Sequence, residues 1–132
     1  MEKIVFDANA MLSFLYEEKN YEKVHDILQR AHENKTPMFL SVINYGEIYY
    51  SVMRYSGREK AEKLKSMLEG IPVELVPVYT PDAQEAAEIK AVKKMSYADC
   101  FAAALAKRLG AVIVTGDPEF REVEKTVKVR WV

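Results

Sequence analysis

Four acidic residues stand at the borders of apolar stretches in this 132-residue chain. Asp7 follows the run KIVF, Glu47 follows MFLSVINYG, Asp99 lies near the start of an alanine-rich run, and Asp117 follows AVIVTG. Carboxylate oxygens are the ligands that hard cations such as Mg²⁺ and Mn²⁺ prefer. Carboxylates within about 4–6 Å of one another repel, so a cation stabilises any such group. If the fold brings these acids together, they form a site for a divalent cation.

Each acid also has a purely structural explanation when it is taken alone. Glu47 and Asp99 lie in the predicted first turns of two helices, where a carboxylate satisfies free backbone N–H groups. Asp117 lies in a Gly-Asp-Pro turn, which needs no chemistry. A zinc site is not indicated, because the two histidines, His25 and His32, lie on one predicted helix and face solvent.

The elements that would position these acids alternate between strands and helices. Apolar or β-rich runs predict strands at residues 3–6, 38–43, 73–78, 111–117 and 127–132. Periodic apolar positions predict helices at residues 7–18, 20–34, 44–57, 57–70, 80–94 and 96–110, and a short turn or helix at 118–125. This alternation predicts an α/β fold with a parallel sheet and helices on both faces. Pro77 predicts an edge position for its strand.

The ends of these helices carry recognisable signals. Asn44 is predicted to be an N-cap, with Glu47 completing a capping box. Ser96 is predicted to cap the helix 96–110, which Gly110 ends.

The topology brings the acids to one edge of the predicted sheet. Because crossover helices run opposite to parallel strands, the carboxyl ends of strands and the amino ends of helices share one edge, where ligands bind. Asp7 and Asp117 end strands, and the other two acids begin helices. Three polar residues are predicted to lie beside them: Asn9, Ser96 and Thr115.

Composition limits the classes of protein to consider. The chain has 19 basic and 20 acidic residues and a net charge of −1, so binding of a polyanion would need a local patch or a metal. The single cysteine, Cys100, excludes an internal disulfide, fits a reducing cytoplasm, and is interpreted as a buried structural thiol. No apolar window reaches the roughly 18 residues of a membrane helix. We expect one domain over residues 1–132 and no membrane partner.

Four segments of the chain carry a resemblance to a known family. They are IVFDANAML, SVINYGEIYY, MSYADCFAAALAKRLGAVIVTGDPEF and the closing strand. In their order and spacing they resemble the PIN-domain ribonucleases, and most closely the VapC-type toxins of prokaryotic toxin–antitoxin pairs. The resemblance implies a three-layer α/β/α domain with a central, mostly parallel sheet of about five strands. It also implies a cytoplasmic endoribonuclease that depends on one or two Mg²⁺ or Mn²⁺ ions.

The resemblance also implies roles for individual residues. The four acids would be catalytic and would bind metal: Asp7 and Asp99 directly, Asp117 directly or through water, and Glu47 by completing the shell or orienting the attacking water. The three polar neighbours named above would hold these carboxylates in place. Glu119 stands near the position of a further family acid, and we do not count it among the predicted ligands. Hydrolysis by an activated water would leave a 5′-phosphate.

Partners are predicted from two surfaces. Lys90, Lys93 and Lys94, together with Arg54 and Arg58, are candidate contacts for RNA phosphates, although a solvated charged face balanced by nearby glutamates is the favoured explanation for the two arginines. Five large side chains crowd one helix and predict a homodimer contact or a partner groove: Tyr45, Tyr49, Tyr50, Met53 and Tyr55. The resemblance implies dimerisation and inhibition by a VapB-type antitoxin.

Other classes of protein share parts of this pattern. A catalytically inactive PIN-like module that only binds RNA or protein would have the same fold, although the full acid set argues against it. A receiver-type signalling domain also holds Mg²⁺ at a sheet edge, but it needs an aspartate at the end of a middle strand, and VELVPVYT supplies none. An aspartyl phosphatase needs a second acid two positions after the first, where this chain has Asn9.

Overall fold

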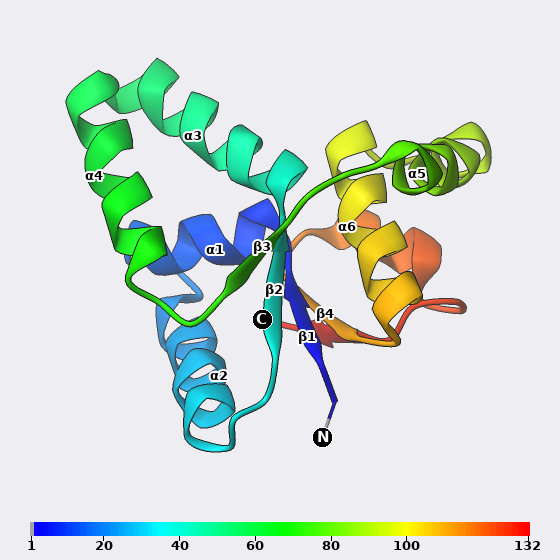
Figure 1. The fold of residues 1–132 in the computed structure, drawn as a ribbon, viewed down its shortest axis with the longest axis horizontal. Helices are drawn as coiled ribbons and strands as arrows, with labels where there is room; N and C mark the ends of the chain where they lie inside the picture. The colour runs from blue at the N-terminus through cyan, green and yellow to red at the C-terminus, as the bar shows by residue number, and fades with distance from the viewer. Residues whose placement is uncertain (1) are drawn as a thin grey trace.

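A five-stranded, all-parallel sheet forms the centre of the computed structural model, which describes residues 2–132 (Figure 1). The strands are β1 (Ile4–Phe6), β2 (Met38–Ser41), β3 (Glu74–Val76), β4 (Val112–Thr115) and β5 (Val129–Trp131). Their order is β3-β2-β1-β4-β5, so β1 is the central strand and β3 lies at an edge. The predicted fold class is confirmed, as is the edge position expected from Pro77.

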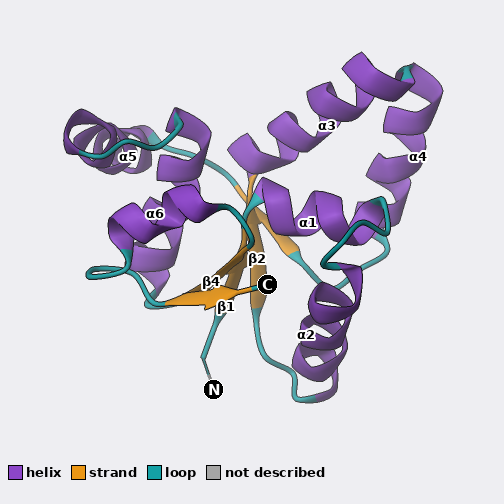
Figure 2. Ribbon diagram, turned by 180° about the vertical axis from the view of Figure 1, so that it is seen from behind, coloured by secondary structure: helices purple, strands orange, loops and turns teal. Residues whose placement is uncertain are grey.

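Helices cover both faces of this sheet, as Figures 1 and 2 show from opposite sides. The helices are α1 (Ala8–Leu15), α2 (Tyr21–Glu33), α3 (Val42–Ser56), α4 (Arg58–Glu69), α5 (Thr80–Val92) and α6 (Tyr97–Leu109), followed by the 3₁₀ helix η1 (Pro118–Val123). Side chains alternate along β1, so Ile4 and Phe6 pack with α1 to α4, whereas Val5 packs with α5, α6 and η1. The central strand is therefore buried on both faces.

The start of α3 differs from the sequence prediction. The strand predicted at 38–43 ends at Ser41, and Val42 already belongs to the helix. Ser41 is the N-cap, because its Oγ accepts a hydrogen bond from the backbone N–H of Ile43 at 3.2 Å. Asn44, predicted to be the cap, is a fully buried helical residue whose Nδ2 donates to the carbonyl oxygen of Ala98 at 3.2 Å. The partner of Asn44 lies on another helix, which the local sequence pattern does not reveal.

The other helix termini follow the sequence signals. The Asp7 carboxylate caps α1 by accepting from the N–H of Ala10 at 2.8 Å. Ser96 caps α6 by accepting from the N–H of Asp99 at 3.2 Å. Gly110 ends α6 with φ 62°, a left-handed conformation that glycine adopts readily. These caps fix the amino ends of α1 and α6 at the carboxyl edge of the sheet.

The crowded face of α3 is divided between core and solvent. Tyr45, Tyr49 and Met53 pack against the core beneath α1 to α4. Tyr50 and Tyr55 remain 52% and 82% exposed, on the hairpin of α3 and α4 that projects from the sheet (Figure 1). Within the described residues, no helix is both long and apolar enough to cross a membrane.

Candidate active site

Asp7 is the most deeply placed acid of the sheet edge. It directly follows the central strand β1 and is fully buried, although a carboxylate is costly to remove from water. Its Oδ1 caps α1, and its Oδ2 accepts a hydrogen bond from Thr115 Oγ1 at 2.5 Å. Thr115 ends the neighbouring strand β4, so the two strands together hold this carboxylate.

The turn after β4 delivers Asp117 to the same edge. Thr115 Oγ1 accepts from the N–H of Asp117 at 2.9 Å, and Asp117 Oδ1 accepts from the N–H of Glu119 at 2.9 Å. Asn9, at the start of α1, accepts from the N–H of Gly116 at 3.0 Å through its Oδ1. Hydrogen bonds of Thr115 and Asn9 therefore fix this turn.

Asp99 lies in the first turn of α6, where it is almost fully buried. Its backbone N–H binds the Ser96 hydroxyl, and the N–H of Ser96 donates to Glu119 Oε1 at 3.0 Å. The side chains of Glu119 and Asp99 are also close enough to share a proton when one of them is protonated. Ser96 and Glu119 therefore connect the start of α6 to the start of η1.

Glu47 is half-buried on α3 and faces the same acidic group. Its Oε1 is a buried oxygen without a hydrogen-bond partner among the described residues, and so is Oδ1 of Asn44, one turn earlier on the helix. A buried polar atom left without a partner costs about 1–3 kcal/mol.

The pKa values of Asp7, Asp99 and Glu47 are raised by burial and further by neighbouring charges. Burial raises the pKa of Asp7 to about 7, and the charges of Asp117 and Glu47 add to this shift. Burial, the hydrogen bond with Glu119, and the charges of Asp117 and Asp7 raise the pKa of Asp99 to about 8. The pKa of Glu47 is raised by burial and by the charges of Asp117 and Glu119, whereas hydrogen bonding from Asn44 lowers it. The four acids predicted from sequence are therefore close enough to interact in the fold.

The tightest acidic group contains a residue that the sequence analysis left out. One carboxylate oxygen each of Asp99, Asp117 and Glu119 lies within 4.8 Å of the others. Such a group of oxygens, crowded by like charge, has the ligand chemistry of a hard divalent cation. The signal for Glu119 was its position two residues after Asp117, because the first turn of η1 returns it to the edge.

Of the three lysines predicted to contact RNA, one makes a hydrogen bond within the protein through its ammonium group. The turn from α5 to α6 is short and touches η1, because the N–H of Lys94 donates to Glu122 Oε1 at 3.2 Å. Lys93 and Lys94 are exposed on this turn, but Lys90 donates from Nζ to the Met95 carbonyl at 2.7 Å and closes the turn.

The arginines lie on the hairpin of α3 and α4 rather than at the acidic group. Arg54 is seven residues beyond Glu47, about 10 Å further along α3. Its guanidinium lies 5.3 Å from the centre of the Tyr50 ring. Arg58 begins α4 at the far end of the hairpin. Neither residue reaches the acids from this position.

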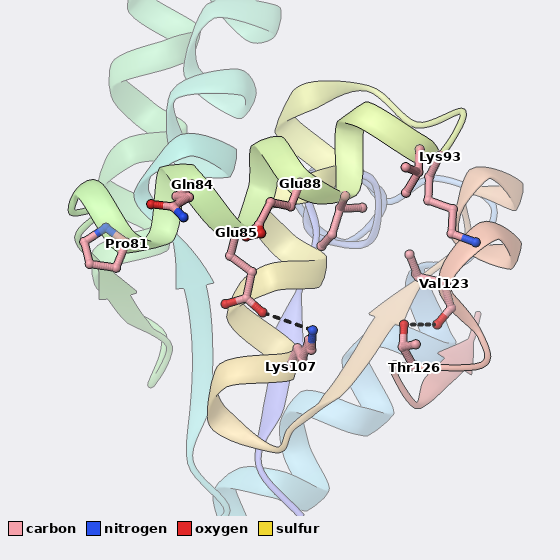
Figure 3. A pocket seen from close by; sticks show the side chains of 10 residues that line it. Pro81, Gln84, Glu85, Glu88, Lys93, Lys107, Val123 and Thr126 are labelled. Carbon is pink, nitrogen blue, oxygen red and sulfur yellow. Dashed lines mark hydrogen bonds and ion pairs between the residues drawn. The ribbon is translucent and has the colours of Figure 1, made fainter.

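A separate groove of about 500 Å³ lies along α5 (Figure 3). Glu85 and Glu88 line it, but Glu85 pairs with Lys107 at 3.4 Å, and none of the acids at the sheet edge lines it. Lys93, at the end of α5, also points toward this groove. The groove is therefore distinct from the acidic group.

Gly116 is predicted to be required for the placement of Asp117. A Cβ atom at this position would lie 2.9 Å from Asn9 Oδ1, 3.1 Å from Asn20 Nδ2 and 3.3 Å from the carbonyl oxygen of Val132. We expect Gly116→Ala to break the hydrogen bond that the Gly116 N–H donates to Asn9 Oδ1, at a cost of about 1 kcal/mol, and to move the turn that carries Asp117. The melting temperature and the affinity for Mn²⁺ should both fall, which differential scanning fluorimetry and isothermal titration calorimetry would measure.

Gly46→Ala is the matched control for this substitution. Gly46 is an exposed helical residue of α3, and a Cβ there would meet nothing within 4 Å. Alanine is the better helix former by about 1 kcal/mol, so this variant should be at least as stable as the wild type. Equal stability and Mn²⁺ affinity of the two variants would contradict the role given to Gly116.

Comparison with known proteins adds a family match and several similar folds. A family model described as the PIN domain matches residues 4–126. No protein with a curated description matches the sequence.

Three crystal structures illustrate the similar folds. The first is VapBC2 from Rickettsia felis bound to a DNA fragment from their promoter, with TM-score 0.77, 15% sequence identity and 96% of each chain covered. The second is DNA-bound VapBC from Salmonella typhimurium, with TM-score 0.75, 20% identity and 98% of each chain covered. The third is VapC20 from Mycobacterium tuberculosis, a sarcin-ricin loop cleaving toxin, with TM-score 0.75, 18% identity, and 97% of this chain and 99% of that chain covered. At these identities the likeness concerns the fold alone.

Proposed function

Because the chain belongs to the PIN-domain family, we propose that it is a metal-dependent endoribonuclease and the toxin of a type II toxin–antitoxin pair. The observation that carries this proposal is the acidic group at the carboxyl edge of the sheet. Three carboxylates meet within 4.8 Å there, and Asp7 and Glu47 lie near them, with pKa values raised by burial and by the charge of Asp117. A protein fold has no structural need for so many neighbouring carboxylates, whereas a cation-dependent hydrolase does.

The proposed ion is Mg²⁺ or Mn²⁺, held by Asp99, Asp117 and Glu119, with Asp7 and Glu47 completing the site. When bound, it would lower the pKa of a water molecule and neutralise charge on the phosphate. Hydrogen bonds from Thr115 and from the backbone of α1 favour the ionised form of Asp7 that a cation would need, whereas burial favours its neutral form.

Other residues of the chain would bind and position RNA. Lys93 and Lys94 are exposed on the turn that leads into α6, the helix of Asp99, and are the proposed phosphate contacts. Asn9, through its hydrogen bond to Gly116, keeps Asp117 in place, and Ser96 does the same for Asp99 and Glu119. The expected product of hydrolysis carries a 5′-phosphate.

The proposed partners are a VapB-type antitoxin and a second copy of the chain, and an RNA substrate implies action in the cytoplasm. Several of the solved structures with this fold are toxin–antitoxin complexes, among them VapBC-1 from nontypeable Haemophilus influenzae. The exposed Tyr50 and Tyr55 offer an aromatic surface of the kind enriched at protein interfaces.

The direct test of the proposed function is RNA cleavage with and without metal. We expect the purified protein to cut a fluorogenic single-stranded RNA in the presence of Mg²⁺ or Mn²⁺, and excess EDTA to abolish the signal. Restoring the cation should restore cleavage, which separates metal removal from denaturation. Cleavage that persists in EDTA, or products ending in a 2′,3′-cyclic phosphate, would contradict the proposed chemistry.

A further inference from the structure

The side chain of Asn20 does not cap α2, although the residue stands at the N-cap of this helix. An asparagine in this position normally accepts a hydrogen bond from a backbone N–H of the first helical turn. The Asn20 amide makes no such bond, and it makes no other hydrogen bond within residues 2–132. A half-buried polar group is therefore present here without the usual structural reason.

The Asn20 amide lies against the turn that carries Asp117. A Cβ atom on Gly116 would lie 3.1 Å from Asn20 Nδ2 and 2.9 Å from Asn9 Oδ1, so the glycine allows both side chains to approach the backbone. Asn9 Oδ1 accepts from the N–H of Gly116, which leaves the exposed Asn9 Nδ2 as a donor. Two carboxamides, one from α1 and one from the start of α2, therefore flank the backbone directly before Asp117.

A carboxamide in this place suits a hydroxyl group better than a phosphate. Phosphate oxygens are bound most strongly by a metal or by cationic side chains, whereas an amide is uncharged and offers one donor group and one acceptor. The ribose 2′-hydroxyl is also both donor and acceptor, so it can bind either end of the amide. Every phosphate of an RNA chain is joined to a ribose on each side. A group next to a metal-binding residue therefore meets a ribose that flanks the scissile phosphate.

We propose that Asn20 is a specificity-determining residue that binds the 2′-hydroxyl of a ribose beside the scissile phosphate, an inference that rests on the proposed ribonuclease function. Carboxylates and a cation act on any phosphodiester, but the sugar of RNA differs from that of DNA by this hydroxyl. The hydroxyl takes no part in the proposed hydrolysis, because an activated water attacks phosphorus. Removing it from the substrate therefore measures recognition rather than chemistry.

A cycle that combines one change in the substrate with one change in the protein tests this contact. The substrate is a fluorogenic RNA in which one nucleotide at a time, near the cleavage site, carries a 2′-deoxyribose. For the wild type we expect kcat/KM to fall about 3–10-fold at one position, which corresponds to the loss of one neutral hydrogen bond. In Asn20→Ala, kcat/KM for the all-ribose RNA should fall by a similar factor, and the deoxyribose at that position should cause no further loss.

Asn34→Ala is the matched control for this variant. Asn34 stands at the other end of α2, where it is exposed and has a backbone (φ −88°, ψ 1°) like that of Asn20 (φ −102°, ψ 15°). Most residues adopt this conformation, so alanine should be tolerated at both positions. The control should cleave both RNAs as the wild type does. If Asn20 only supports the turn of Asp117, Asn20→Ala will slow the cleavage of both RNAs equally and keep the deoxyribose penalty.

Binding measured without cleavage tests the same contact independently of activity. In an Asp99→Asn background, fluorescence anisotropy with Mn²⁺ should show single-stranded RNA bound about 3–10-fold more tightly than DNA of the same base sequence, and Asn20→Ala should remove most of this difference. A wild type without a deoxyribose penalty at any position, or an equal penalty in Asn20→Ala, would overturn the inference while RNA cleavage still supports the ribonuclease. A wild type that cuts no RNA would instead overturn the proposed function, and the binding preference would then decide whether Asn20 contacts the ribose.

Discussion

Asp99→Asn should abolish RNA cleavage while leaving the fold intact. The substitution keeps the size of the side chain but removes the charge from the group in which oxygens of Asp99, Asp117 and Glu119 lie within 4.8 Å. We expect kcat/KM to fall by at least about 10²–10³-fold, the loss seen when one group that stabilises developing charge is removed from an active site. Initial rates on a fluorogenic RNA at saturating Mn²⁺ would measure this loss.

The same variant should be as stable as the wild type, or more so, in the absence of metal. Burial and neighbouring charges raise the pKa of Asp99 to about 8, so its ionised form opposes folding at neutral pH. A neutral amide removes this repulsion, and therefore the loss of activity cannot be attributed to unfolding.

Asp26→Asn provides the matched control for activity. Asp26 is an exposed residue of α2 that pairs with Arg30 at 3.1 Å, away from the acidic edge. This exposed ion pair contributes little to stability, so the control should cleave RNA at the wild-type rate. Cleavage by Asp99→Asn at more than a few per cent of that rate would exclude Asp99 as an essential ligand.

The thermal stability of the metal-free protein should fall as the pH rises from about 4 to about 8. The pKa values of Asp7 and Asp99 are raised from 3.8 to about 7 and about 8. The folded chain therefore keeps two protons at pH values where the unfolded chain has released them. Because the folded state binds more protons in this range, the free energy of unfolding decreases with rising pH and levels off above about pH 8.

A divalent cation should reverse this loss of stability. It favours the ionised carboxylates and binds only the folded site, so it stabilises the fold by about 2.7 kcal/mol at a concentration of 100 times its Kd. Melting curves recorded in EDTA and in Mn²⁺ across this pH range would measure the effect. The difference in melting temperature between the two conditions should grow as the pH rises. In Asp99→Asn the pH dependence should be weaker. Two results would refute the proposed cation site: a melting temperature that rises with pH in EDTA, or one that Mn²⁺ does not change at high pH.

Much of the fold follows from local rules that the sequence displays. Asp7, Ser96 and Gly110 occupy their predicted helix termini because each acts on backbone groups within a few residues of itself. The alternation of strands and helices predicted the parallel sheet, and the topology of such a sheet brings the ends of distant strands together. Asp7 and Asp117 could therefore be assigned to one edge without coordinates.

Other features of the site depend on partners that lie far away in the sequence. Ser41 rather than Asn44 caps α3, because the Asn44 amide is taken by Ala98, 54 residues later. Lys90 was expected to contact RNA, but its ammonium closes the turn before α6 through the Met95 carbonyl.

The sequence by itself determined which elements form and that acids of distant segments share an edge, because backbone capping and crossover topology are set by local chemistry and chain direction. Only the tertiary structure decided which oxygens come within a few ångströms of one another. Glu119 entered the acidic group through the first turn of η1, and Asn44 was buried with one oxygen unpaired beside Glu47. Such distances depend on how helices pack across the sheet, and no pattern along the chain encodes them.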